Sequence, residues 1–228
     1  SLPIVFRTTV SFIACTCYRE LVDFVRPLQA VIPGAQGRIL AVLAQTTAEL
    51  NLRTVARLAG VSAAQASRVL PTLVELGLVE RQEVPPSSLF GLNRENVAAQ
   101  SVIELSRSHQ LALDQIGAAV SHLVPSPTSV IIFGSFARRE ADKYSDIDVV
   151  VVRPGTVEED DVGWGEGVEQ FRRRVRSITG NPAEIIEICE ADASGKLAGS
   201  QSLWADVARE GIVIHGGSVA DVVGAVGV

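Results

Sequence analysis

The stretch GSFARREADKYSDID, residues 134–148, decides how the C-terminal half of this chain is interpreted. It joins two runs rich in β-branched residues, 129–133 and 146–152, which predict two short strands. On the second strand Asp146 and Asp148 are two residues apart, so their carboxylates project from one face and repel each other unless a cation lies between them. Oxygen ligands of this kind suit Mg²⁺ or Mn²⁺, which proteins bind together with nucleotide phosphates.

The residues around the turn after the first strand suit a bound triphosphate. Gly134 permits a close backbone approach, and the Ser135 hydroxyl and neighbouring amides can donate hydrogen bonds to phosphate oxygens. Arg138 and Arg139 follow the turn, where they can neutralise phosphate charge. We therefore assign Gly134, Ser135 and Arg138 to nucleotide binding, together with Ser145, which directly precedes the paired acids.

Gly-Ser followed after ten residues by Asp-x-Asp resembles the signature of the DNA polymerase β-like nucleotidyltransferases, in particular the minimal nucleotidyltransferases. The resemblance implies a mixed β-sheet flanked by helices, with a third carboxylate on a neighbouring strand. The segment 180–186 resembles that third strand and has Glu184 at the acidic position. Glu187 is the competing choice, and it points to the opposite face of the sheet because it lies three residues further on.

The same resemblance implies a reaction. Asp146, Asp148 and Glu184 would hold two metal ions, and Glu184 would ligate one of them or help to deprotonate the acceptor hydroxyl. The hydroxyl would attack the α-phosphorus of ATP or another nucleoside triphosphate and release pyrophosphate. The family offers two acceptor classes, a protein such as a HEPN-type toxin and a small hydroxylated molecule. A rival hypothesis is a DNA-binding regulator whose C-terminal domain senses a nucleotide without turnover.

The N-terminal half has a different pattern. A turn at Gly60 precedes a helix expected over 62–76, and the runs 78–81 and 89–92 predict two strands of a wing. Residues 37–92 resemble a winged helix-turn-helix of MarR-like and ArsR-like regulators. The resemblance implies that DNA is a partner. The residues that would contact DNA are Arg53, Arg57, Ser62, Gln65, Arg68 and Arg81.

Two features weaken the expectation of DNA binding. Residues 37–90 carry a balance of only about +1, so attraction to phosphates is weak unless a homodimer combines two faces. Pro71 lies inside the expected recognition helix and predicts a kink. A winged helix that serves dimerisation or partner docking is therefore the alternative.

The expected fold is α+β, with the winged helix followed by the mixed-sheet domain. One long helix is predicted over 95–123, and the proline-rich stretch at 125–128 predicts a boundary. The expected divisions are an N-terminal extension 1–36, a winged helix-turn-helix 37–94, a connecting helix and linker 95–128, a nucleotidyltransferase domain 129–216 and a tail 217–228.

Composition sets the broad class. Hydrophobic residues make up 47% of the 228 residues and charged residues 20%, which is typical of a globular protein. The net charge of −6 argues against a protein coated all over with nucleic acid but permits a local basic face. Three cysteines are too few for a disulfide framework, and we expect a cytoplasmic protein without a membrane segment. His109 and His122 are expected to be surface or packing residues without specific partners, and Trp164 and Trp204 to anchor the core.

Overall fold

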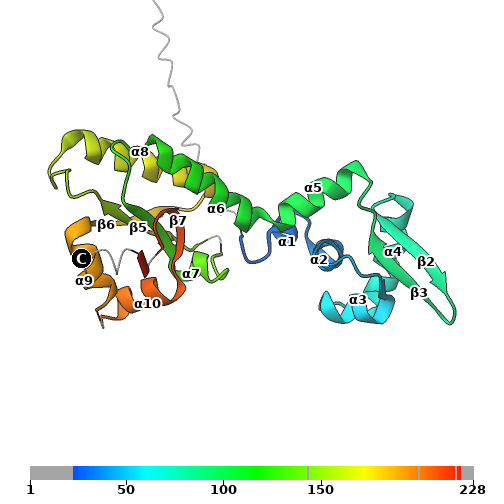
Figure 1. The fold of residues 1–228 in the computed structure, drawn as a ribbon. Helices are drawn as coiled ribbons and strands as arrows, with labels where there is room; N and C mark the ends of the chain where they lie inside the picture. Colours follow the sequence, from blue (N-terminus) through cyan, green and yellow to red (C-terminus); the bar gives the residue numbers. More distant parts are fainter. Residues whose placement is uncertain (1–22, 143, 200, 219, 222–228) are drawn as a thin grey trace, which may run out of the picture.

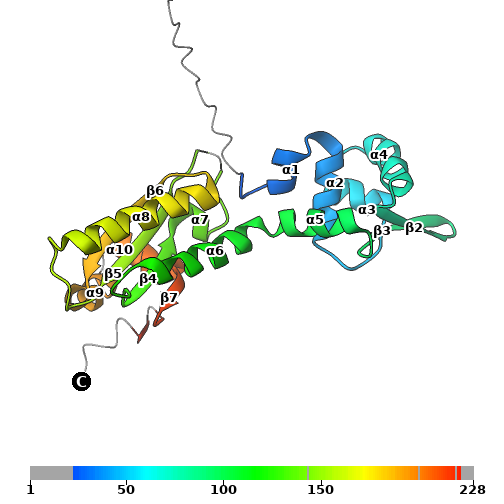
Figure 2. The same cartoon turned by 90° about the horizontal axis from the view of Figure 1, so that it is seen from above.

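The computed structural model describes residues 23–142, 144–199, 201–218 and 220–221. Two lobes are joined through consecutive helices (Figure 1), and the view from above shows the same division (Figure 2). Expectations for residues 1–22 and 222–228 lie outside the described residues. No helix in the described ranges is long and apolar enough to cross a membrane.

The N-terminal lobe is a winged helix-turn-helix, as predicted. Its small sheet has the order β1-β3-β2, with both pairs antiparallel. A buried core that includes Leu40, Leu43, Leu70 and Leu73 joins its helices to this sheet. Its elements are α1 (Pro27–Val31), α2 (Gly34–Ala44), β1 (Leu50–Asn51), α3 (Leu52–Leu58), α4 (Ala63–Glu75), β2 (Val79–Val84) and β3 (Ser87–Leu92).

The helix α4 has a strong start and continues through its proline. The side chains of Ser62 and Gln65 form a capping box, in which each accepts a hydrogen bond from the other's backbone amide, at 3.1 and 2.9 Å. Pro71 lies within the helix, which ends only at Glu75. Because Pro71 and Ser67 are both exposed, water can satisfy the Ser67 carbonyl that lacks a partner amide on Pro71.

The prediction of one long connecting helix is wrong. The chain forms α5 (Val97–Ser106) and α6 (Ser108–Ala119), which are separated at Arg107. The hydroxyls of Ser106 and Ser108 donate to the carbonyls of residues three positions earlier, and such bonds compete with the helical pattern. Each helix also buries its apolar face in a different lobe, α5 in the N-terminal core and α6 in the C-terminal core.

The C-terminal lobe contains a mixed four-stranded sheet flanked by helices, which confirms the predicted fold class. The strand order is β6-β5-β4-β7, where β5 and β6 are parallel and the other pairs antiparallel. Its elements are β4 (Ser129–Phe133), α7 (Gly134–Ala137), β5 (Ile147–Arg153), α8 (Val162–Thr179), β6 (Ala183–Cys189), α9 (Glu190–Leu197), α10 (Ser202–Glu210) and β7 (Ile212–Gly216).

The two faces of this sheet have separate cores. The face that contains Val149 and Val151 packs against α6 and α8, and the face that contains Val150 and Val152 packs against α9 and α10. Trp164 belongs to the first core and Trp204 to the second, and only 2% and 7% of their surfaces are exposed, so both anchor the core as predicted. Because side chains alternate along a strand, Asp148 emerges on the same face as Val150.

Candidate functional site

Three acidic residues converge at one end of the C-terminal sheet. In the parallel pairing of β5 and β6, Asp148 is directly opposite Glu184, so their side chains leave the same face. Asp146 is exposed and lies directly before β5, which begins at Ile147, one residue later than the sequence predicted. The structure therefore brings together the three carboxylates that the sequence analysis singled out.

Gly134 is required by the close approach of Asp148. A Cβ atom added to Gly134 would lie 2.3 Å from the Asp148 Oδ2 atom, a distance that real side-chain carbons do not tolerate. The backbone of Gly134 also has a φ of +70°, in the left-handed region that favours glycine. The Gly-Ser turn and the acidic strand are thus in direct contact, where Phe133 pairs with Asp148.

Electrostatic repulsion is concentrated on Asp148. Burial raises the pKa of the Asp148 carboxyl above its ordinary value, and the neighbouring carboxylates of Asp146 and Glu184 raise it further. The positive charge of Arg138 acts in the opposite direction. A cation next to Asp148 would relieve this repulsion, so the charge pattern favours a metal ion or another positive ligand.

The donor chemistry fits a hard divalent cation, since all three side chains offer carboxylate oxygens. Within the described ranges, no three His, Cys, Asp or Glu side chains are already placed closely enough to hold a metal ion. The three acids thus fit Mg²⁺ or Mn²⁺ by the chemistry of their donor atoms and by their charge.

Glu187, the competing third acid, has a different role. It lies on the opposite face of β6, where its Oε1 atom accepts a hydrogen bond of 2.7 Å from Arg153 Nε. The Arg153 side chain is only 8% exposed and also donates to the Val157 carbonyl. Glu187 therefore neutralises a buried arginine and does not face Asp148.

Arg138 is partly occupied by acidic partners. Its Nε atom donates to Glu140 at 2.8 Å, and its Nη1 atom donates to Glu210 of α10. These hydrogen bonds raise the pKa of Arg138, which stays charged throughout the physiological range. Arg138 is close enough to influence Asp148, but a triphosphate would have to compete with the two glutamates for it.

Ser145 and Asn181 organise the loop before the paired acids. The Ser145 hydroxyl donates to Asp142 Oδ1 at 3.0 Å and accepts from the Asp142 amide, so it stabilises the loop itself. The fully buried Asn181 donates from Nδ2 to the carbonyls of Asp142 and Ser145, at 3.0 and 2.7 Å. The sequence analysis did not single out Asn181, although a polar residue in the short turn between a helix and a strand is a recognisable signal.

The expectation that His109 lacks a specific partner is wrong. Only 7% of its surface is exposed, and its Nε2 atom lies 2.7 Å from the carbonyl oxygen of Phe136 in α7. The two rings are also stacked, with centroids 4.6 Å apart. The sequence did not reveal this contact because 27 residues separate the two partners, which meet through the packing of α6 beside α7.

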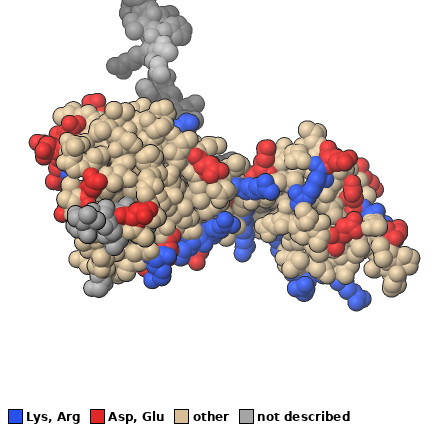
Figure 3. Space-filling model, in the orientation of Figure 1, with Lys and Arg blue, Asp and Glu red and all other residues tan. Residues whose placement is uncertain are grey.

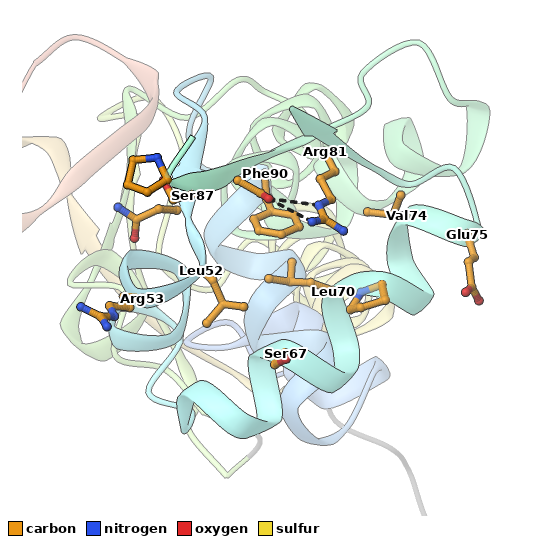
Figure 4. Close-up of a pocket in the computed structure, with 13 residues that line it drawn as sticks. Leu52, Arg53, Ser67, Leu70, Val74, Glu75, Arg81, Ser87 and Phe90 are labelled. Atoms are coloured by element: carbon orange, nitrogen blue, oxygen red, sulfur yellow. Dashed lines mark hydrogen bonds between the residues drawn. The ribbon is translucent and has the colours of Figure 1, made fainter. Parts of the chain in front are cut away.

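The N-terminal lobe has a groove of about 850 Å³ between α3, α4 and the wing. Leu52, Leu70 and Phe90 point into the groove, with Arg53 and Arg81 at its edges (Figure 4). Arg81 donates to Ser88, as the dashed lines show, and also pairs with Glu83 at 2.6 Å. The groove combines an apolar floor with a partly neutralised basic rim.

Apart from Arg81, which pairs with Ser88 and Glu83, the predicted DNA-contacting residues fall into two groups. Arg53, Arg57 and Arg68 are exposed on α3 and α4. Ser62 and Gln65 cap α4, so the Ser62 Oγ and Gln65 Oε1 atoms are already engaged as acceptors within the helix. On the face shown in Figure 3, basic side chains gather around the waist between the lobes and below the winged helix, so local basic surface exists despite the net negative charge.

Comparison with known families identifies both lobes. Residues 113–191 match the nucleotidyltransferase domain family, a range that contains the Gly-Ser turn and all three acids. Residues 37–83 match the IclR helix-turn-helix domain, rather than the MarR-like or ArsR-like type to which the sequence was likened. The chain therefore carries a nucleotidyltransferase domain, and the prediction of an enzyme of this class is confirmed.

Two solved structures are similar to parts of the chain. A toxin-antitoxin crystallised with AMP-PNP is 16% identical, over 48% of this chain and 77% of that one, with a TM-score of 0.34. RV1404 from Mycobacterium tuberculosis is 24% identical, over 45% of this chain and 70% of that one, with a TM-score of 0.32. At these scores the likenesses carry no further argument. A comparison with curated proteins finds no significant match.

Proposed function

We propose that this chain, which joins a nucleotidyltransferase domain to an IclR-type helix-turn-helix domain, transfers a nucleotidyl group from ATP or another nucleoside triphosphate to a hydroxyl group. One observation carries the proposal. Asp148 lies opposite Glu184 and against Gly134, which supports a single site made of the paired acids, the third acid and the Gly-Ser turn.

Each residue has a distinct role in the proposed reaction. Asp146, Asp148 and Glu184 would hold Mg²⁺ or Mn²⁺, which supplies positive charge to the triphosphate and to the developing charge on the leaving group. The Gly134 and Ser135 amides and the Ser135 hydroxyl would bind phosphate oxygens, and Arg138 would add positive charge once it leaves its glutamates.

The acceptor oxygen would form a bond to the α-phosphorus while the bond to the pyrophosphate breaks. The exposed Glu184 carboxylate is available to take the proton of the attacking hydroxyl. Most of the rate acceleration would come from positioning and from neutralisation of charge. A protein acceptor, such as a HEPN-type toxin, suits an exposed site of this kind, because Asp146 and Glu184 are both open to solvent.

The position of the label in ATP tests this proposal. Purified chain is incubated with Mg²⁺ and a lysate of cells that express it, in parallel with ATP labelled at the α- or the γ-phosphate. Nucleotidyl transfer labels a macromolecule from α-labelled ATP only, whereas phosphoryl transfer labels it from γ-labelled ATP. The double variant Asp146→Asn, Asp148→Asn should abolish the label. Label that requires the added wild-type chain but comes from γ-labelled ATP, or equal label with the double variant, would contradict the proposal.

DNA binding by the winged helix is a second function, supported by the exposed arginines on α3 and α4 beside the groove. Retention on duplex DNA should fall as salt rises and should decrease with Arg57→Ala and Arg68→Ala together. It should survive the double aspartate variant, because the acidic site lies in the other lobe. If the double aspartate variant also lost retention on DNA, the DNA would be binding at the nucleotide site and not on the winged helix.

A further inference from the structure

The residue after the Gly-Ser turn is held from two sides. Phe136 is fully buried, and the His109 ring stacks on it at 4.6 Å with an interplanar angle of 25°. The Phe24 ring meets it edge-on, with centroids 5.0 Å apart and an angle of 78°. We call Phe24, His109 and Phe136 the Phe136 clamp.

His109 adds a polar contact to this packing. A carbonyl oxygen can only accept, so the Nε2 atom that lies 2.7 Å from the Phe136 oxygen must carry the proton. Burial lowers the pKa of His109, which favours the neutral ring with a single N–H. The buried Nδ1 atom has no hydrogen-bond partner within the described part of the chain, so the bond to Phe136 anchors the ring.

Backbone hydrogen bonds around Phe136 couple the position of Phe136 to that of the Gly-Ser turn. The Phe136 carbonyl also accepts from the Arg139 amide at 3.0 Å, while the Gly134 and Ser135 carbonyls accept from Arg138 and Glu140 at 3.1 and 2.8 Å. The segment 134–140 is thus a closed unit of short-range hydrogen bonds. A unit of this kind moves as a whole, so contacts on Phe136 also fix the amides of Gly134 and Ser135.

The two sides of the clamp come from different parts of the chain. His109 lies at the start of α6 and Phe24 in the segment just before α1. Four residues later, Leu28 is buried in the core of the winged helix. The segment before α1 extends from the winged-helix lobe toward α7 in both views (Figures 1 and 2).

We propose that Phe24 and His109 are positioning residues, which hold the Gly134–Ser135 turn in place for the triphosphate and make nucleotide affinity depend on docking of the winged helix. This inference rests on the proposed nucleotide-binding function. Neither residue touches the substrate, and both act through Phe136. Loss of one neutral hydrogen bond or one aromatic contact should weaken ATP binding about fivefold.

Two measurements on the full chain test the clamp. Hydrogen exchange of the segment 134–140 without nucleotide reports the rigidity of the turn, and calorimetric titration with ATP and Mg²⁺ reports affinity. The variants are His109→Phe, which keeps a stacking ring but removes the donor, His109→Gln, which keeps a donor, and Phe24→Ala. Leu113→Ala serves as the matched control, because Leu113 is buried in the same core one turn further along α6.

Faster exchange at 134–140 and about fivefold weaker ATP binding are expected for His109→Phe and Phe24→Ala, with partial recovery in His109→Gln. Leu113→Ala should lower the melting temperature without either change. Unchanged exchange and affinity in the clamp variants would overturn this inference alone. If the wild-type chain did not bind ATP, the proposed function would fail with it, whereas the exchange data would still report on the clamp.

Discussion

Replacement of Gly134 by alanine should separate backbone strain from damage to the site. The left-handed backbone at φ +70° disfavours alanine by about 1–2 kcal/mol. The new Cβ atom would also lie 2.3 Å from Asp148 Oδ2, well below the 3.0 Å that real Cβ contacts essentially never undercut. The Asp148 carboxylate would therefore turn away by about 1 Å, and a displacement of this size at a reacting centre can reduce the rate about 10²-fold.

Gly60 provides the matched control. It has a similar φ of +60°, but an added Cβ would meet nothing within 4 Å. Gly60→Ala should lose about 1–2 kcal/mol of stability from strain while it keeps full activity. Both variants would be compared in denaturant unfolding and in Mg²⁺-dependent pyrophosphate release from ATP at saturating acceptor lysate.

The expected result is a similar loss of stability in the two variants and a loss of activity in Gly134→Ala alone. Wild-type pyrophosphate release by Gly134→Ala would refute the argument, because it would mean that the position of the Asp148 carboxylate next to the turn does not matter for the reaction. Equal losses of activity in both variants would point to general destabilisation instead.

Three further predictions concern the acids. Glu184→Gln should reduce pyrophosphate release at least about 10²-fold with little change in stability. Glu187→Gln should lower the unfolding temperature and leave activity unchanged, because it weakens the ion pair with a buried arginine. The reverse pattern would mean that Glu187, and not Glu184, is the third acid of the site. Burial and like charges raise the pKa of Asp148, so its contribution to stability is fully present below pH 3.8 and is lost as pH rises through the raised pKa. Asp148→Asn should therefore stabilise the metal-free chain against urea unfolding at pH 7 but not below pH 3.8. Glu210→Gln should release Arg138 and tighten ATP binding about twofold in calorimetry, and unchanged affinity would show that this ion pair does not compete with the nucleotide.

Much of the catalytic domain could be predicted because its signals are local. The β-branched runs on either side of the Gly-Ser turn form β4 and β5 as expected. The alternation of side chains along a strand also distinguished Glu184 from Glu187, which lie on opposite faces of β6. The choice of Glu184 as the third acid came from the resemblance to the nucleotidyltransferases, and the alternation of side chains showed only that Glu187 faces the other way.

Contacts between distant elements could not be predicted in the same way. The break at Arg107 arises because α5 and α6 bury their apolar faces in different lobes, although their apolar residues alone suggest one stripe. Arg138 is paired with Glu210 across 72 residues, so its availability to a phosphate depends on where α10 packs. His109 is the extreme case, because an isolated histidine on a helix carries no sequence signal for the carbonyl that it binds.

The contacts of Arg138 and His109 both act on the segment that follows Gly134. Arg138 and Phe136 both belong to the segment that follows Gly134, and each is held by an element outside the sheet, α10 in one case and α6 with the Phe24 segment in the other. Asp148 and Glu184 are fixed by sheet register, whereas the segment proposed to bind phosphate depends on packing that can change without disturbing the sheet. Any control of this enzyme by its winged-helix lobe should therefore alter the affinity for nucleotide more than the arrangement of the acids.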